Sequence, residues 1–160
     1  MQFSAEIKME IPGNEIVVDK YLKVWYQFAA TPQWYEPAGS YNIRAQYERD
    51  ANGNITVRNT LQYRGKSKSI SGFLVPTSTP GKFKVKLERA ILWFTITADY
   101  DVQYVYADEN GEYVAAIVGD DKYTYVLCDS LTPSCDLQAK ITARLGAEKV
   151  KKLNFTAQVC

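Results

Sequence analysis

Residues 19–29 read Asp-Lys-Tyr-Leu-Lys-Val-Trp-Tyr-Gln-Phe-Ala, a polar turn followed by an aromatic segment with Trp25 near its start. Asp19 can cap a single helical turn that runs to Leu22, and the aromatic residues that follow favour a strand over about residues 23–30. A turn cluster at residues 12–14 precedes this stretch, so residues 1–15 are expected to form a loose lead-in. We expect residues 19–29 to begin a closed β-barrel, with Trp25 plugging its closed end.

Side chains that alternate between apolar and polar predict seven more strands after the first. Along residues 40–49, for example, Tyr41 and Ile43 alternate with Asn42 and Arg44. The expected strands cover residues 40–49, 55–63, 67–75, 82–89, 102–107, 113–118 and 123–128. Turns that contain Gly, Asn and Asp join most of them as hairpins. The very apolar residues 90–98 fit the end of one strand, a bend, or the start of the next.

Eight strands joined in order by short turns form an up-and-down meander, which closes into a barrel and so leaves no exposed sheet edge. The interior of such a barrel is either filled by side chains or holds one small ligand. The predicted fold class is therefore all-β, an eight-stranded antiparallel up-and-down barrel over residues 23–129. At 160 residues, the chain is expected to form a single domain over residues 1–160.

The hydrophobic period changes after the last barrel strand. Thr132 is a good N-cap and Pro133 fits the first helical position, while Leu137, Ile141 and Leu145 recur every four residues. A helix is therefore expected over residues 132–146, packed outside the barrel and ended by the glycine at 146. Alternating apolar residues then predict a last strand at 153–159. One helix outside, rather than two over the mouth, distinguishes this pattern from the shorter fatty-acid-binding type of barrel.

Composition excludes several classes of function. The net charge is +1, so no overall field favours nucleic acid or acidic substrates. The chain has no His, which removes Ser-His-Asp and Cys-His catalysis and zinc binding through imidazole. We therefore expect no catalytic residues, no metal and no cofactor. No apolar run approaches the roughly 20 residues of a membrane-spanning helix, and residues 1–8 lack the apolar core of a signal peptide.

The three cysteines are Cys128, Cys135 and Cys160, and their spacing fits no metal motif. They are interpreted either as buried or incidental thiols or as one disulfide plus a free thiol, and the connectivity cannot be deduced from sequence. Alternation with Tyr125 and Leu127 predicts that Cys128 lies on the outer face of its strand.

The inward faces of the predicted strands mix apolar side chains with tyrosine hydroxyls, which is typical of a pocket for a small hydrophobic molecule. The same side chains could instead simply fill the barrel. The candidate ligand-binding residues are Tyr41, Ile43, Ile55, Val57, Tyr63, Phe83, Val85, Leu87, Tyr104, Tyr106 and Tyr125. Trp34 and Tyr35 occupy a proline-containing loop. They are expected to fold back over the protein, to cover the mouth of the barrel, or to contact a partner or a membrane surface.

Several motifs occur in the order found in one known family. Residues 21–26, Tyr-Leu-Lys-Val-Trp-Tyr, resemble its Y-L-G-x-W-Y signature, and Ala45-Gln46-Tyr47 followed by Asn52-Gly53 resembles a strand and hairpin. Residues 113–119, 123–127 and 156–160 are similar to its last barrel strands and its ending. Over residues 14–160 the chain resembles the lipocalin family, nearest the bacterial lipocalin and apolipoprotein D branch.

The resemblance implies a protein that carries or sequesters a small hydrophobic ligand, such as a fatty acid or other lipid, a retinoid or a tetrapyrrole. It also favours a secreted or periplasmic location, although residues 1–8 alone leave a cytosolic one open. We expect a monomer or weak dimer with at most peripheral membrane contact. The alternatives are a lipid-modifying enzyme of the same fold and an interaction module that uses Trp34 and Tyr35.

Two positions depart from the family pattern. Lys23 stands where the signature has Gly, and the family's Arg that covers the Trp ring has no counterpart, since Asp129 or Leu131 falls there. The cation over Trp25 is therefore expected to be lost, or supplied by Lys23 or Arg144. Asn42 stands near the family's strand cysteine, so Cys160 is expected to lack its family partner.

Overall fold

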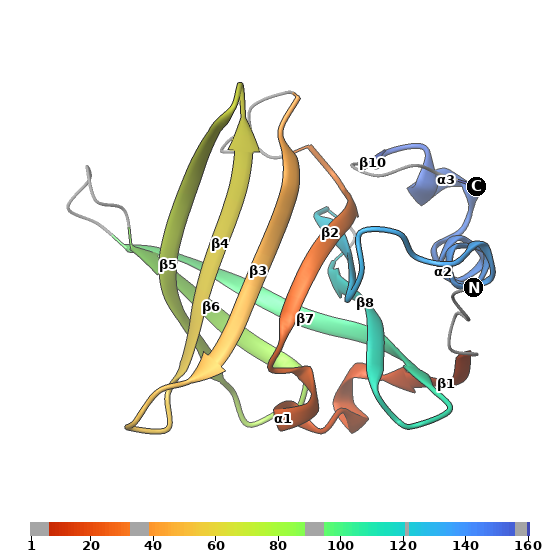
Figure 1. Ribbon diagram of the computed structural model, residues 1–160. Coiled ribbons are helices and arrows are strands. Elements are labelled where there is room, and N and C mark those ends of the chain that lie inside the picture. The colour runs from red at the N-terminus through yellow and green to blue at the C-terminus, as the bar shows by residue number, and fades with distance from the viewer. Residues whose placement is uncertain (1–6, 33–38, 89–94, 121, 156–159) are drawn as a thin grey trace.

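A single sheet closes on itself to form the wall of the molecule (Figure 1). The computed structural model describes residues 7–32, 39–88, 95–120, 122–155 and 160. Hydrogen-bonded neighbours in the sheet follow the order β1-β7-β6-β5-β4-β3-β2-β9-β8, and β8 also pairs with β7, which closes the barrel. The strand pairings are antiparallel. The chain therefore has the predicted antiparallel β-barrel fold.

The elements follow one another with short connections, which is why successive strands are neighbours. In chain order they are β1 (Ile7–Pro12), η1 (Gly13–Glu15), α1 (Val18–Tyr21), β2 (Val24–Ala30), β3 (Tyr41–Arg49), β4 (Ile55–Tyr63), β5 (Lys66–Pro76), β6 (Lys82–Glu88), β7 (Thr95–Asp108), β8 (Tyr113–Gly119), β9 (Thr124–Cys128), α2 (Cys135–Leu145), α3 (Ala147–Val150) and β10 (Asn154–Phe155). The eight predicted barrel strands correspond to β2–β9.

The prediction of a loose lead-in over residues 1–15 was wrong for residues 7–15. Ile7–Pro12 forms β1, which pairs with the second half of β7, and η1 follows it. The β7 strand is long enough for this because Thr95–Asp101 pairs with β6 and leaves the same edge free beyond that point. The cluster Pro12-Gly13-Asn14 does mark a turn, but an element precedes it that the sequence did not predict.

Backbone contacts help to close the lower end of the barrel. A Cβ atom on Gly13 would lie 1.6 Å from the carbonyl oxygen of Val102, and one on Gly81 would lie 2.2 Å from the carbonyl oxygen of Gly13. Val102 N also donates to Gly81 O at 2.8 Å. Only glycine allows η1, the β5–β6 turn and β7 to approach one another so closely. The short helix α1 lies beside them, below the ends of the strands (Figure 1).

The helix α2 lies outside the barrel, as predicted, but begins later than predicted. Its N-cap is Ser134, whose hydroxyl accepts a hydrogen bond from Leu137 N at 3.1 Å, and not Thr132. The hydroxyl of Thr132 instead lies 3.3 Å from that of Ser130. Thr132 therefore belongs to the turn before the helix and does not cap it. Gly146 ends the helix with a φ of 86°. Of the predicted last strand, Asn154–Phe155 pairs with β2, and residues 156–159 lie outside the described residues.

Two hydrophobic cores result, one on each side of the barrel wall. The inner core contains Trp25, Ile55, Phe83 and residues from the other strands. The outer core lies beneath α2 and joins Leu137 and Ile141 to outward-facing residues of β2, β7, β8 and β9. Among the helices in the described ranges, none has the length and apolar character needed to cross a membrane.

Candidate functional site

The closed end of the barrel is built on Trp25 and Lys23. Trp25 is completely buried, and its Nε1 donates to the carbonyl oxygen of Tyr21 at 2.9 Å. The ammonium of Lys23 lies 5.5 Å from the centre of the Trp25 ring and donates to Tyr113 O at 2.7 Å. Lys23 thus supplies the cation that the family pattern would place over this ring, one of the three outcomes that the sequence left open.

Carboxylates surround the same ammonium. Asp129 lies 3.8 Å and Glu112 4.0 Å from Lys23 Nζ. Burial raises the pKa of Asp129, and the nearby ammonium of Lys23 opposes that rise. Arg144, the other candidate, lies over the ring of Tyr104 at 4.4 Å and forms an ion pair with Glu10. Its place on the outer side explains why it cannot reach Trp25.

Three tyrosines meet above this floor. The hydroxyl of Tyr47 donates to that of Tyr100 at 2.9 Å, and the Tyr21 and Tyr100 hydroxyl oxygens lie 2.5 Å apart. Burial raises the pKa of Tyr21, Tyr47 and Tyr100 above the usual tyrosine value, so all three stay neutral in the folded protein. Three hydroxyl protons serve two hydrogen bonds among these described residues. One hydroxyl proton is therefore not used within this cluster.

These three tyrosines are not among the ligand-binding residues predicted from the sequence. Tyr47 does lie on the predicted inward face of its strand, and Tyr21 belongs to the family signature. Tyr100, however, lies in a segment that was assigned to no strand. The extension of β7 back to Thr95 is what brings Tyr100 opposite Phe83 and into the barrel.

The middle of the barrel is lined by four of the predicted ligand-binding residues that are buried in the inner core: Ile55, Val57, Phe83 and Leu87. Two more predicted residues, Val85 and Tyr125, are half-buried and pack against them. Leu74 pairs with both Ile55 and Val85 and completes this apolar wall.

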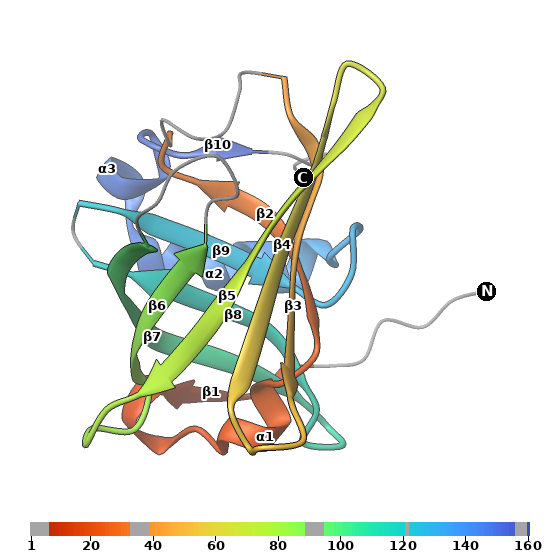
Figure 2. The same cartoon turned by 90° about the vertical axis from the view of Figure 1, so that its left-hand side faces the viewer.

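Inward-facing side chains become accessible towards the upper end. Ile55 and Val57 at the start of β4 are buried, whereas Leu61 and Tyr63 on the same face are half-buried. Ile43 and Ile70 on the neighbouring strands are half-buried too. The apolar lining thus continues from the buried middle of the barrel to an end that solvent reaches. Figure 2 shows the β4–β5 hairpin rising beyond the other strands at that end.

Two predictions on β7 were wrong. Tyr104 and Tyr106 belong to the outer core beneath α2, and not to the lumen. A register shift between Val102 and Tyr104 in the pairing with β8 reverses the alternation. Val102 therefore faces inward, and Val105 replaces Tyr104 and Tyr106 in the inner core. A bulge of this kind leaves no mark in a simple alternating pattern.

Tyr41 is also misplaced by the prediction, because 42% of its surface is exposed. The pairing of β3 with β4 is irregular between Tyr41 and Arg44, and Asn42 has a φ of 49°. This irregularity separates Tyr41 from the inward face on which Ala45 and Tyr47 lie. Trp34 and Tyr35 lie outside the described residues, so their roles stay predictions.

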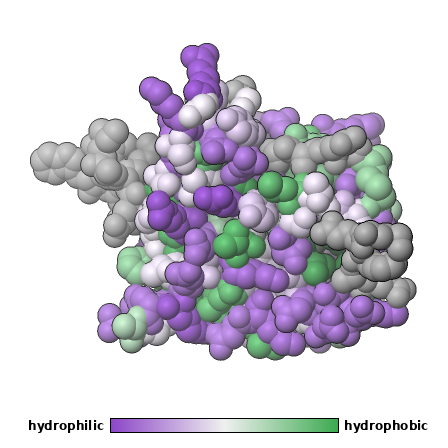
Figure 3. Space-filling model, in the orientation of Figure 1, coloured by the Kyte–Doolittle hydropathy of each residue, from purple (hydrophilic) through white to green (hydrophobic). Residues whose placement is uncertain are grey.

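The outer wall carries two grooves, of about 410 Å³ and 160 Å³. Both run over β3, β4 and β5, and they share Gln46 and Arg58. Their other lining residues include Arg44, Thr60 and Ser69. Figure 3 shows mostly hydrophilic side chains on this side of the molecule. The grooves thus lie on the opposite side of the wall from the apolar lining.

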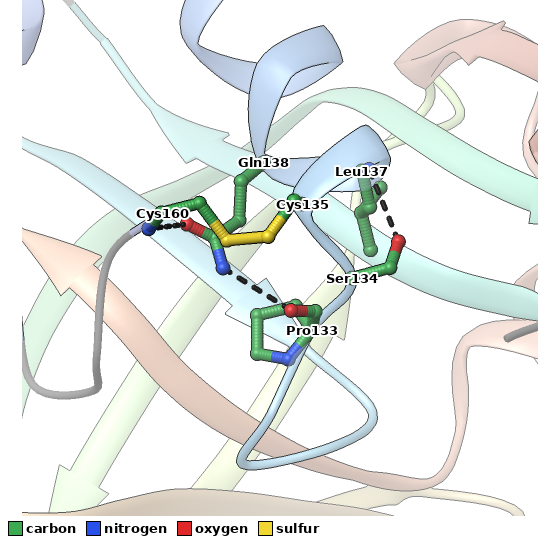
Figure 4. Close-up of a disulfide and its surroundings, with 6 residues drawn as sticks. All are labelled: Pro133, Ser134, Cys135, Leu137, Gln138 and Cys160. Atoms are coloured by element: carbon green, nitrogen blue, oxygen red, sulfur yellow. Dashed lines mark hydrogen bonds between the residues drawn. A yellow bond between two sulfur atoms is a disulfide. The ribbon is translucent and has the colours of Figure 1, made fainter. Parts of the chain in front are cut away.

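Cys160 lacks its family partner, as expected, and instead forms a disulfide with Cys135 at the start of α2 (Figure 4), which is the alternative of one disulfide plus a free thiol. Gln138 supports the pair: its Oε1 accepts from Cys160 N at 3.0 Å, and its Nε2 donates to Pro133 O at 3.1 Å. The partner thus comes from α2, and not from the strand that carries the family's cysteine. Cys128 is a free thiol buried in the outer core, as its alternation predicted.

The protein is a meander barrel that is closed at one end and reaches solvent at the other, with one helix packed outside. These features define the class of lipocalin-like barrels. The family model of the lipocalin-like domain matches residues 16–158, and the chain belongs to this family. Temperature-induced lipocalin-1 of Arabidopsis thaliana is 30% identical over 114 residues, which are 68% of this chain and 59% of that protein. The match therefore covers less than two thirds of that relative's length.

Solved structures show the same fold. Insecticyanin of the tobacco hornworm Manduca sexta has a TM-score of 0.69 and 15% identity, with 98% of this chain and 88% of that chain covered. The cockroach allergen Per a 4 has a TM-score of 0.67 and 16% identity, with 97% and 96% covered. Apocrustacyanin C2 has a TM-score of 0.61 and 18% identity, with 93% and 91% covered. At these identities the likeness concerns the fold alone.

Proposed function

We propose that this protein binds a small hydrophobic molecule in the barrel lumen and carries or sequesters it. The observation that carries the proposal is the continuous apolar lining, which runs from buried Ile55 and Val57 to half-buried Leu61 and Ile70 at the open end. An apolar molecule that entered there would remove this surface from water, which favours binding by about 25 cal/mol per Å² before the costs of association.

The lumen also offers polar contacts that could orient a ligand. The tyrosine cluster has one hydroxyl proton to donate, and Asn59 faces inward between Val57 and Leu61. A few polar groups in an otherwise apolar cavity are typical of sites for small hydrophobic molecules. Fatty acids and other lipids, retinoids and tetrapyrroles all meet this description.

The proposal is binding without catalysis. Cys128 is the free thiol in the chain, and burial raises its pKa to about 12, so that it stays protonated at neutral pH. A protonated thiol on the outer side of the wall is a poor nucleophile toward a molecule in the lumen. The lumen lies within one chain, so a monomer or weak dimer is sufficient. The Cys135–Cys160 disulfide supports a secreted or periplasmic location, where disulfides persist.

A pair of neighbouring substitutions on β4 tests where the ligand binds. Leu61 faces the lumen and Thr60 faces outward, so Leu61→Trp fills the mouth while Thr60→Trp adds the same ring outside. Dissociation constants for a fatty acid, retinol and a bilin are measured by fluorescence titration. We expect Leu61→Trp to weaken the binding of the probe that binds by at least about tenfold, and Thr60→Trp to change it less than about twofold.

Two results would contradict the proposal. One is equal weakening by both substitutions, which would place the probe outside the lumen. The other is the absence of any fluorescence response to all three probes, together with a melting temperature that none of them raises.

A further inference from the structure

The lumen-facing side of the β4–β5 hairpin changes from apolar to cationic at the mouth. In the register of the two strands Leu61 lies opposite Lys68, and Tyr63 lies opposite Lys66. Residues directly opposite each other share one face of the sheet, and Ile55 and Leu74 of this face lie in the inner core. Lys66 and Lys68 therefore stand on the same face as the apolar lining, beyond Ile70 on β5 and level with Leu61 and Tyr63 of β4.

These cations have no carboxylate partner among the described residues. The ammonium of Lys68 lies 5.6 Å and the guanidinium of Arg64 5.1 Å from the centre of the Tyr63 ring. Between residues 51 and 87 the chain has seven Lys and Arg residues and no Asp or Glu. On the outer wall this charge is balanced by β7, where Asp99 pairs with Lys84 and Asp101 lies opposite Lys82. On the lumen side of the hairpin, none of the carboxylates in the described ranges pairs with Lys66 or Lys68.

We propose that the ligand of this barrel is an anionic amphiphile, with its charged head held by Lys66 and Lys68 and its apolar part in the lumen. This inference rests on the function proposed above and adds the charge and orientation of the ligand. Two ammonium groups over an apolar lining attract a carboxylate, sulfate or phosphate group, while Leu61 and Ile70 beside them cover the adjoining chain or ring.

The closed end is a poor place for the charged head. Lys23, the cation at the floor, already donates to Tyr113 O and lies near Asp129 and Glu112. The tyrosine cluster is neutral and has one free proton, and an anion buried there without a cation would lose most of its hydration energy. The head therefore stays at the mouth, where water and two cations reach it.

A matched pair of probes tests this inference. Dansylaminoundecanoic acid and its primary amide have nearly the same shape and differ in charge, and their dissociation constants are measured by dansyl fluorescence. We expect the wild-type protein to bind the acid about tenfold more tightly than the amide in low salt. The preference falls as salt screens the charges. In Lys66→Gln/Lys68→Gln we expect the two constants to agree within about twofold, because binding of the acid weakens.

Matched variants separate charge from side-chain identity. Lys66→Arg/Lys68→Arg retains the preference, and Lys84→Gln/Lys86→Gln, which removes two lysines from the outer wall, leaves it unchanged. Equal melting temperatures establish that the variants are folded. The inference is overturned if the wild type binds the acid and the amide equally, or if Lys66→Gln/Lys68→Gln still prefers the acid. In both cases the binding of the amide still supports the proposed function. If neither probe binds to the wild type, the proposed function fails as well.

Discussion

At the scale of single residues, Lys23 shows how one departure from a family pattern can be compensated. Its ammonium lies over the Trp25 ring and pairs with Asp129, one of the two residues that could stand where the family has Arg. The cation thus reaches the ring from the residue just before β2, two positions ahead of Trp25. The same contact accounts for a carboxylate at position 129, because Asp129 lies 3.8 Å from the ammonium of Lys23.

Replacing Lys23 by Met keeps most of the apolar stem and removes the charge. We expect a loss of about 1–2 kcal/mol in the free energy of unfolding, because the contact with Trp25 and the hydrogen bond to Tyr113 O are both lost. Urea denaturation measures the loss. Lys86→Met on the exposed outer wall is the control and should change stability by less than about 0.5 kcal/mol. A loss at Lys23 no larger than in the control would refute a structural role for the cation.

The residue scale is also where prediction from sequence was least complete. Alternation placed Ile55, Val57 and Phe83 on the inward face because β4 and β6 pair in regular register. Alternation failed for Tyr104 and Tyr106 because a bulge in β7 reverses the faces, and for Tyr41 because β3 is irregular at its start. The position of a bulge depends on the register of two paired strands, and it cannot be predicted from the sequence of one strand alone.

At the scale of elements, the predictions of strand number and order depended on turns with clear chemistry. The hairpin loops at Gly53 and Gly111 adopt positive φ, as turns of this kind require. The elements that were missed are β1 and α3, while the start of β7 within residues 90–98 is one of the three alternatives that the sequence left open. β1 exists because the edge of β7 is available to it.

The helix α2 is held by a covalent link as well as by its apolar face. Replacing Cys135 and Cys160 by Ser should lower the free energy of unfolding by about 3.5 kcal/mol, the loop-closure value for a separation of 25 residues. Thermal or urea unfolding measures the effect. A reducing agent should lower the stability of the wild type to that of the double variant and leave the double variant unchanged. A wild type insensitive to reduction would show that the link contributes nothing.

At the scale of the whole molecule, the buried tyrosines make the fold sensitive to alkaline pH. The pKa values of Tyr21, Tyr47 and Tyr100 are raised by burial, so the folded state holds these protons more tightly than the unfolded state. Stability from this source is fully present below the unfolded pKa of about 10, and it falls as pH rises beyond that value.

In a Cys128→Ala background, which removes the buried thiol whose raised pKa would lower stability from about pH 9, urea midpoints measured from pH 8 to pH 11 should stay level to about pH 10 and then fall. Tyrosinate absorbance should rise together with the loss of folded structure, because the three hydroxyls ionise only when the barrel opens. Tyr47→Phe should make the fall less steep, whereas Tyr123→Phe at an exposed position should not alter it. Full ionisation of the tyrosines in a barrel that stays folded would disprove this account.

The strand β1 determines where an expression fragment of this protein should begin. The family match begins at residue 16, yet β1 (Ile7–Pro12) pairs with β7. Two residues of β1 also contact α2, since Lys140 Nζ donates to Ile7 O and Arg144 forms an ion pair with Glu10. An expression fragment trimmed to the matched range would strip one whole strand from the wall. The backbone of β7 opposite it would then be bare, and a bare strand edge is a template on which other copies can stack. Fragments meant to stay dispersed at high concentration should therefore retain residue 7 and those that follow.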